Sequence, residues 1–280
     1  MSNDVVDAES TGHETARTRD HVRRVLNRVP EVTLYFWVIK ILATTVGETA
    51  SDYLADTRGL GLPKTMLMMG ALLALILGVQ FALRRYVPAV YWAAVVLISI
   101  VGTNITDQLH DGFGISNVVI APLFAVALAI VFAVWYMVEH TLSIHTIYTA
   151  RRERFYWLAV LFTFALGTAA GDLLAESLNL GYWVSAAIFG TAIAVVYGLH
   201  VVVKLNAVLA FWLAYILTRP FGASVGDGLS QHHHSGLGLG TTTTSLIFLA
   251  VIALVVSFLS ISSIDREATV IDDSVEAVEL

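Results

Sequence analysis

The sequence has no cysteine, and only 14% of its 280 residues are charged. The absence of cysteine excludes disulfides, thiolate metal sites and cysteine redox chemistry. An ordinary soluble domain is about a quarter charged and about half apolar. This chain is 57% hydrophobic and has a mean hydropathy of +0.74. So few charges cannot cover so much apolar surface in water, and the composition predicts a protein surrounded largely by lipid.

The sequence also lacks a nucleophile–base arrangement, a phosphate-binding loop and a metalloprotease motif, so we expect no enzyme and no nucleic-acid partner. The net charge of −6 says little about the membrane part, because half of the 22 acidic residues lie in residues 1–20 and 265–280. The acidic N-terminus has no apolar stretch behind a basic patch, which predicts that it is not a cleavable signal peptide. Residues 1–28 and 265–280 are predicted to be polar cytoplasmic tails.

Eight stretches are long enough to cross a bilayer, which takes about 20 apolar residues. Their continuous apolar composition, without the alternation of a strand, predicts helices. The fold class is therefore all-α, a polytopic membrane protein of about eight transmembrane helices. The expected spans are about 32–53, 63–83, 88–108, 116–139, 155–174, 182–203, 206–226 and 243–263.

Basic residues in the short loops predict the orientation of the chain. Arginines between residues 17 and 28, and basic residues at 84–85, 151–154, 204 and 266, all fall on one side. The other side has only Arg58 and Lys64. This asymmetry predicts a multi-pass protein of the plasma (inner) membrane with both termini in the cytoplasm.

One pattern, aromatic-Trp-x9-Gly-x4-Asp, occurs four times in the odd-numbered spans. Such self-similarity indicates a repeat architecture. The four copies contain Trp37, Trp92, Trp157 and Trp212, then Gly47, Gly102, Gly167 and Gly222, then Asp52, Asp107, Asp172 and Asp227. Each copy covers two spans, so all four insert the same way round as parallel repeats. We predict repeats at 29–86, 87–150, 151–205 and 206–264, arranged as a pseudo-fourfold ring or as two pseudo-twofold halves with the odd helices inside.

The segment VPEVTLYFWVIKILATTVGETASDYL resembles a bacterial family of uncharacterised membrane-anchored proteins, built from four tandem two-helix repeats of unknown function. The resemblance covers about residues 29–262. It implies an inner-membrane location in a bacterium, and it brings no established activity.

The repeated residues share one face of each odd helix. At 100° per residue they fall within an arc of about 140°. The glycine and the small residue four positions later form a small-xxx-small pattern, typical of closely packed membrane helices. The tryptophans and their aromatic neighbours are expected near the cytoplasmic interface, where aromatic belts are common.

The four aspartates and Glu48 are candidates for an ion pathway. Each aspartate lies about 22 Å from its tryptophan at 1.5 Å per residue, near the outer end of its span. In a symmetric bundle they would surround one outer vestibule with Glu48 a turn deeper. Carboxylates in a membrane cost about 2.5–3.5 kcal/mol at mid-bilayer, and an ion pathway is a common reason for them. The alternative is that each aspartate caps its helix or pairs locally.

Two basic residues share this face. Arg219 lies near mid-span beside Pro220, which predicts a kinked or broken helix, and Glu48 is its expected partner. Lys40 lies in the cytoplasmic half, where we expect it to pair with Glu139. Both pairs could be structural, or could form a gate.

The loop after the fourth aspartate contains three adjacent histidines, His232, His233 and His234, in a glycine-rich segment. They are a speculative metal site, and a flexible loop is the alternative.

We therefore predict a transporter or channel for a small cation, either a proton or a hard divalent metal such as Mn²⁺ or Mg²⁺, which oxygen ligands suit. A non-transporting scaffold is the alternative. A cofactor protein is disfavoured, because the last two spans have no lysine for retinal and histidines lie only at span ends. No cofactor is expected beyond a bound metal ion. The partners are the lipid bilayer and the cation, and the oligomeric state is open.

Overall fold

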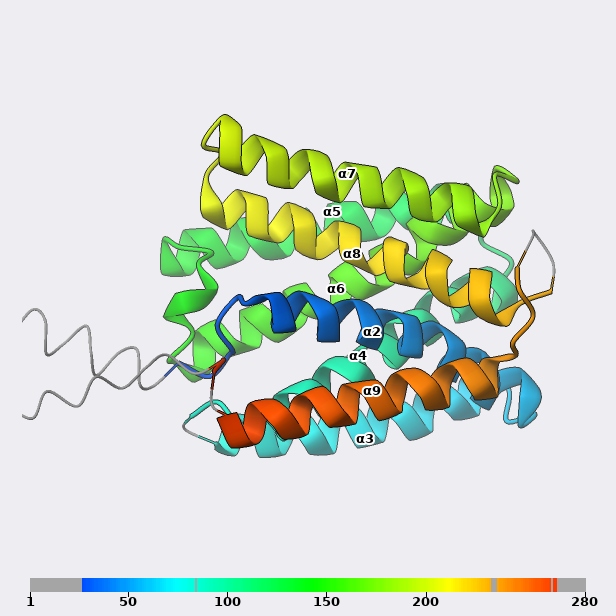
Figure 1. Cartoon of the computed structure of the whole chain (residues 1–280), viewed down its shortest axis with the longest axis horizontal. Coiled ribbons are helices and arrows are strands. Elements are labelled where there is room, and N and C mark those ends of the chain that lie inside the picture. The colour runs from blue at the N-terminus through cyan, green and yellow to red at the C-terminus, as the bar shows by residue number, and fades with distance from the viewer. Residues whose placement is uncertain (1–26, 84, 233–235, 263, 266–280) are drawn as a thin grey trace, which may run out of the picture.

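The computed structural model describes residues 27–83, 85–232, 236–262 and 264–265, so the predicted tails lie almost entirely outside the described residues. Within these ranges the chain is all-helical, with eight α-helices and no strand (Figure 1). The helices are α2 (Leu34–Asp52), α3 (Leu62–Ala82), α4 (Pro88–Asp107), α5 (Asn117–Glu139), α6 (Ala150–Asp172), α7 (Tyr182–Val202), α8 (Ala207–Ser230) and α9 (Thr241–Ser262). The predicted number of eight helices and the all-α class are confirmed.

Local sequence accounts for where the helices begin and end. Side chains of Thr33, Ser116, Thr149 and Asn206 cap the N-termini of α2, α5, α6 and α8, as is usual for these residue types. Immediately after their repeat aspartates, α2, α4 and α6 continue into single π-helical turns at Tyr53–Thr57, Gln108–Gly112 and Leu173–Ser177. Such turns are uncommon and often lie at functional sites.

Seven of the eight helices are long and apolar enough to cross a membrane, as expected of a multi-pass membrane protein. The exception is α2, which contains Lys40, Glu48 and Asp52. Twelve of its nineteen residues are buried against other helices. The protein itself therefore shields most of α2.

The eight helices run roughly along one common direction (Figure 1), and their contacts divide them into an inner and an outer set. The inner helices α2, α4, α6 and α8 pack side by side in a closed ring, in which α8 contacts α2 again. The outer helices α3, α5, α7 and α9 pack mainly against the first helix of the following repeat, and α9 packs against α2. Only 17–33% of each outer helix's apolar window is buried, against 56–72% for α4, α6 and α8. The prediction that the odd-numbered spans lie inside is therefore confirmed, since these spans are α2, α4, α6 and α8. Of the two predicted arrangements, the structure has the pseudo-fourfold ring.

We name the two ends of the bundle by their charges. At the basic end the inner helices begin, close to Arg85, Arg151, Arg152 and Lys204. At the acidic end they reach the four repeat aspartates.

The repeat aromatics form a layer inside the ring at the basic end. The aromatic before each tryptophan contacts the tryptophan of the next repeat, with ring centroids 5.4–6.2 Å apart in all four cases. The pairs are Phe36–Trp92, Tyr91–Trp157, Tyr156–Trp212 and Phe211–Trp37. Trp92, Trp157 and Trp212 are at most 4% exposed. A lipid-facing belt is therefore wrong for these three, because their rings are buried between helices.

The repeat glycines form the contacts between neighbouring inner helices. A Cβ on Gly102 would lie 2.8 Å from the Cβ of Phe164, and one on Gly47 would lie 1.8 Å from the Oγ of Ser99. In the same way Gly167 lies against Arg219, and Gly222 lies against Thr44. These contacts are equivalent around the ring, so the glycines allow the close approach that the small-xxx-small pattern predicts.

Candidate functional site

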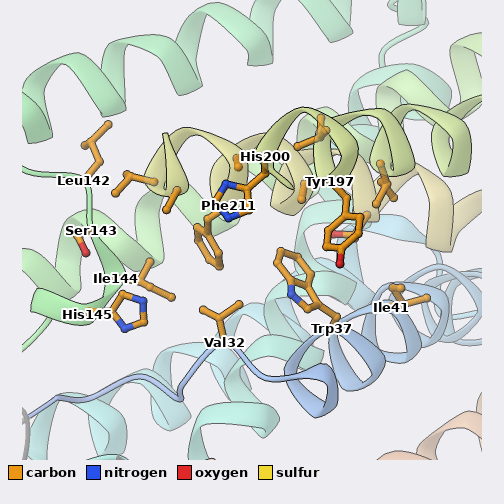
Figure 2. Close-up of a pocket in the computed structure, with 17 residues that line it drawn as sticks. Val32, Trp37, Ile41, Leu142, Ser143, Ile144, His145, Tyr197, His200 and Phe211 are labelled. Carbon is orange, nitrogen blue, oxygen red and sulfur yellow. The ribbon is translucent and has the colours of Figure 1, made fainter. Parts of the chain in front are cut away.

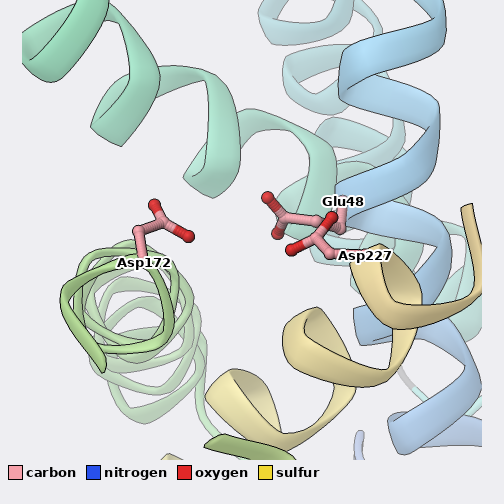
Figure 3. A group of neighbouring side chains, drawn as sticks. All are labelled: Glu48, Asp172 and Asp227. Carbon is pink, nitrogen blue, oxygen red and sulfur yellow. The ribbon is translucent and has the colours of Figure 1, made fainter. Parts of the chain in front are cut away.

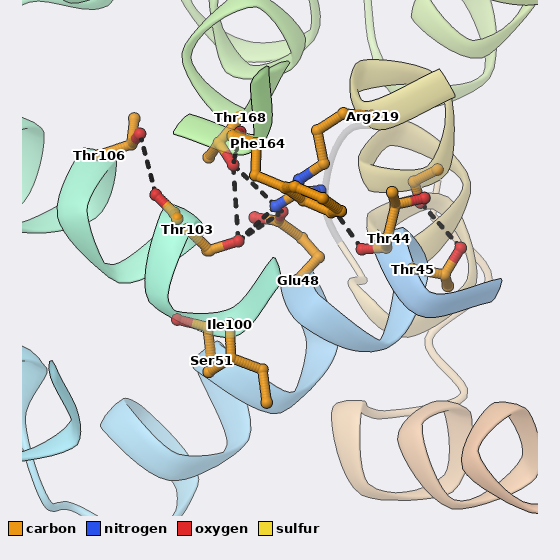
Figure 4. Close-up of polar contacts among 12 residues, drawn as sticks. Thr44, Thr45, Glu48, Ser51, Ile100, Thr103, Thr106, Phe164, Thr168 and Arg219 are labelled. Atoms are coloured by element: carbon orange, nitrogen blue, oxygen red, sulfur yellow. Dashed lines mark hydrogen bonds and ion pairs between the residues drawn. The ribbon is translucent and has the colours of Figure 1, made fainter. Parts of the chain in front are cut away.

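Arg219 occupies the centre of the ring. Its side chain is fully buried and bonds to all three other inner helices (Figure 4). Nη2 donates to Glu48 Oε2 on α2 and to Thr168 Oγ1 on α6, both at 2.7 Å, and also to Thr103 Oγ1 on α4. Nη1 donates to the Thr44 carbonyl at 3.3 Å. The guanidinium group thus closes the axis of the ring at this level.

The pairing of Glu48 with Arg219, predicted from the sequence, is confirmed by an ion pair of 2.7 Å. Glu48, Thr103 and Thr168 occupy the same repeat position, eleven residues after the tryptophan. The repeat therefore places three oxygen-bearing side chains around one guanidinium group. The helix that carries it is continuous from Ala207 to Ser230, so the alternative of a helix broken at Pro220 is wrong.

Three carboxylates gather between Arg219 and the acidic end. One oxygen each of Glu48, Asp172 and Asp227 lies within 4.8 Å of the other two, and we call this group the acid triad (Figure 3). The three residues come from α2, α6 and α8. Glu48 and Asp227 are 5% and 7% exposed. Oxygen ligands at this spacing suit a hard cation.

The other two repeat aspartates are held by neighbours. Asp52 accepts a hydrogen bond of 2.9 Å from Gln231 Nε2, and Asp107 accepts one of 3.4 Å from Ser51 Oγ. Both remain within electrostatic range of Glu48. The structure therefore brings together two of the four aspartates with Glu48. Each of the other two has a hydrogen-bond partner from another inner helix, at the end of α8 and on α2.

Lys40 is buried on the basic side of Arg219, but the predicted pair with Glu139 is wrong. Its Nζ donates to the Tyr215 carbonyl at 3.0 Å and to Thr218 Oγ1 at 2.6 Å. It also lies 3.9 Å from the centroid of the Tyr215 ring, within range of a cation–π interaction. Among the described residues Lys40 has no carboxylate in an ion pair.

Glu139 ends the outer helix α5, and its carboxylate is taken by two arginines at the start of α6. Arg152 Nε donates to it at 2.7 Å, and Arg151 forms a second ion pair. Arg151 and Arg152 therefore lie closer to Glu139 than Lys40 does. Similar depth of Lys40 and Glu139 along the membrane normal did not bring them together.

Sequence reasoning missed a second buried acid, Glu153, at the basic end. Its carboxylate accepts hydrogen bonds from Arg28 Nη1 at 2.6 Å and from Gln80 Nε2 at 2.9 Å, and the side chain is fully buried. Nearby, the hydroxyls of Tyr91 and Tyr156 are hydrogen-bonded to each other inside the aromatic layer. Glu153 lies outside the repeat motif. The one feature of the sequence that could have indicated it is an acidic residue among arginines in the segment RRER.

The histidine prediction stays open. His232 is exposed, while His233 and His234 lie outside the described residues.

These observations define a class: a helical membrane bundle of four parallel repeats around a closed polar axis. Residues 35–86, 90–141, 155–206 and 210–265 each match the repeat described as Repeat of Unknown Function (DUF347). The chain therefore belongs to this family of four tandem repeats. No curated protein and no solved structure matches it.

Proposed function

We propose that the protein transports a small cation, either a hard divalent metal or a proton, along the axis of the inner ring. The observation that carries the proposal is the acid triad, three carboxylates on three inner helices, directly next to the one guanidinium group that closes the axis. Carboxylates inside a membrane bundle are costly, and ion pathways are their usual role.

In this proposal the cation binds at the triad and competes with Arg219 for Glu48. A cation that neutralises Glu48 weakens the ion pair, which frees Arg219 to leave the axis. Because Arg219 and Lys40 both place positive charge on the path, the axis is closed to cations until they move. A gated transporter fits this arrangement better than an open channel. We propose from the loop charges that the basic end faces the cytoplasm.

The test is ion flux into proteoliposomes that contain the purified protein, followed with a Mn²⁺-sensitive dye and, in parallel, a pH-sensitive dye. The double variant Asp172→Asn/Asp227→Asn is expected to lose the flux, because it removes two of three ligand charges and leaves Arg219 with its partner. Asp111→Asn is the control, since Asp111 is an exposed acid at the same end. Equal flux in the double variant and the wild type would exclude the triad as the ion site.

A non-transporting scaffold is the second candidate. The bonding of Arg219 to every other inner helix favours it, because such a centre also fixes the geometry of a rigid bundle. A wild-type protein that folds but moves neither Mn²⁺ nor protons would support this alternative.

A further inference from the structure

A cavity of about 510 Å³ lies on the flank of the bundle, away from the acid triad (Figure 2). Its walls come from α2, α7 and α8 and from residues 142–145 of the loop between α5 and α6. Cavities that hold small ligands measure about 300–1,000 Å³. This one is therefore large enough for a ligand.

The cavity breaks the fourfold packing of the ring. Ala214, two residues after the repeat tryptophan, lines it. The equivalent residues in the other repeats, Ile39, Ala94 and Ala159, are fully buried. At those three positions neighbouring helices close the gap, and on α8 they leave it open. The cavity therefore lies where the fourth repeat departs from the packing of the other three at this position.

The polar groups of the cavity lie toward the basic end. Ser143 and His145 come from the loop, and His200 lies in the last turn of α7. His200 Nδ1 is hydrogen-bonded to the Leu205 carbonyl at 2.9 Å, which leaves its Nε2 for a ligand. Deeper in the bundle the walls are apolar and include Ile41 and Ile193. This order, from polar at the membrane surface to apolar inside, is that of a lipid molecule in one leaflet.

The cavity is accessible from the bilayer. Tyr197 lines it and is 69% exposed. The apolar window of α7 is only 17% buried within the chain. At its floor the cavity reaches Thr218, whose hydroxyl accepts the hydrogen bond from Lys40. A ligand that entered from lipid would therefore end beside the residue that holds Lys40.

We propose that this cavity binds one acyl chain of a phospholipid from the leaflet at the basic end. The chain lies between Trp37, Phe211 and Tyr197, and the glycerol or phosphate oxygens meet Ser143 and His200.

The experiment is native mass spectrometry of the full chain, purified in mild detergent and then given phosphatidylglycerol, a fatty acid or a quinone in separate samples. Wild type is expected to retain one phosphatidylglycerol molecule. Ala214→Trp, which fills the cavity, is expected to lose it, and His200→Leu to retain less. Leu213→Trp is the matched control, since Leu213 lies on the same helix and faces outward.

Equal retention of phosphatidylglycerol by wild type and Ala214→Trp would overturn the proposal, and so would selective retention of the quinone. Should Ala214→Trp fail to fold, a phospholipid with a photoreactive group at its chain end gives a second test on wild type. Labelling of the peptides around Trp37 and Ala214 is expected, and labelling spread evenly over the outer helices would contradict the proposal. Neither measurement depends on ion transport.

Discussion

Replacing Arg219 with methionine is expected to destabilise the folded bundle by about 3–5 kcal/mol, the usual cost of breaking a buried ion pair from one side. Glu48 is only 5% exposed, and the variant leaves its carboxylate without the cation that pairs with it. Thr103 and Thr168 also lose their common hydrogen-bond donor. The measurement is unfolding of the purified protein in detergent, followed by circular dichroism.

Two further variants distinguish the loss of the pair from the loss of a side chain. The double variant Glu48→Gln/Arg219→Met is expected to recover much of the stability, because it contains no unpaired buried charge. Arg85→Met removes an exposed arginine and should change stability by less than about 0.5 kcal/mol. If Arg219→Met unfolds like Arg85→Met, then Arg219 is not the structural centre of the ring.

Replacing Gly102 with alanine is expected to destabilise the protein by about 1–3 kcal/mol, the range for overpacking a filled interior. The added Cβ would lie 2.8 Å from the Cβ of Phe164 and 3.2 Å from the backbone nitrogen of Ala165. Neither atom is at the end of a flexible side chain, so α4 and α6 must move apart. The same unfolding measurement in detergent detects this.

Gly78→Ala is the matched control for Gly102→Ala. Gly78 also lies within a helix, but a Cβ there would meet nothing within 4 Å. Alanine is the better helix former by up to about 1 kcal/mol, so this variant should be neutral or slightly stabilising. Equal losses in the two variants would show that helix propensity, and not contact across the ring, decides the effect.

The sequence predicted the number of helices, the repeat and the ring, because each depends on the spacing of residues along the chain. The same spacing identified Glu48 as the partner of Arg219. Both residues carry charge on the shared inner face, so a symmetric ring brings them to its centre. In a symmetric ring, the number of residues between a side chain and its repeat tryptophan therefore predicts where that side chain lies.

The errors share a physical cause: the sequence gives depth along the membrane normal, but not direction around it. Lys40 and Glu139 were expected at similar depth, yet one faces the axis and the other lies at the end of an outer helix. The tryptophans were assigned to an interface from depth alone, and three of them are buried between helices. The separation of Asp172 and Asp227 from Asp52 and Asp107 depends on two side chains. Gln231 lies outside the repeated positions, and Ser51 lies at a repeated position where two of the other copies have glycine.

The packing of α9 against α2 has a consequence for how the protein is made. The ring joins the first helix to the last, so α2 acquires two of its three main neighbours, α8 and α9, only after nearly the whole chain has been synthesised. Until then the helix with Lys40 and Glu48 has only α4 among these three neighbours. A chain that ended before α9 would leave one flank of this polar helix uncovered.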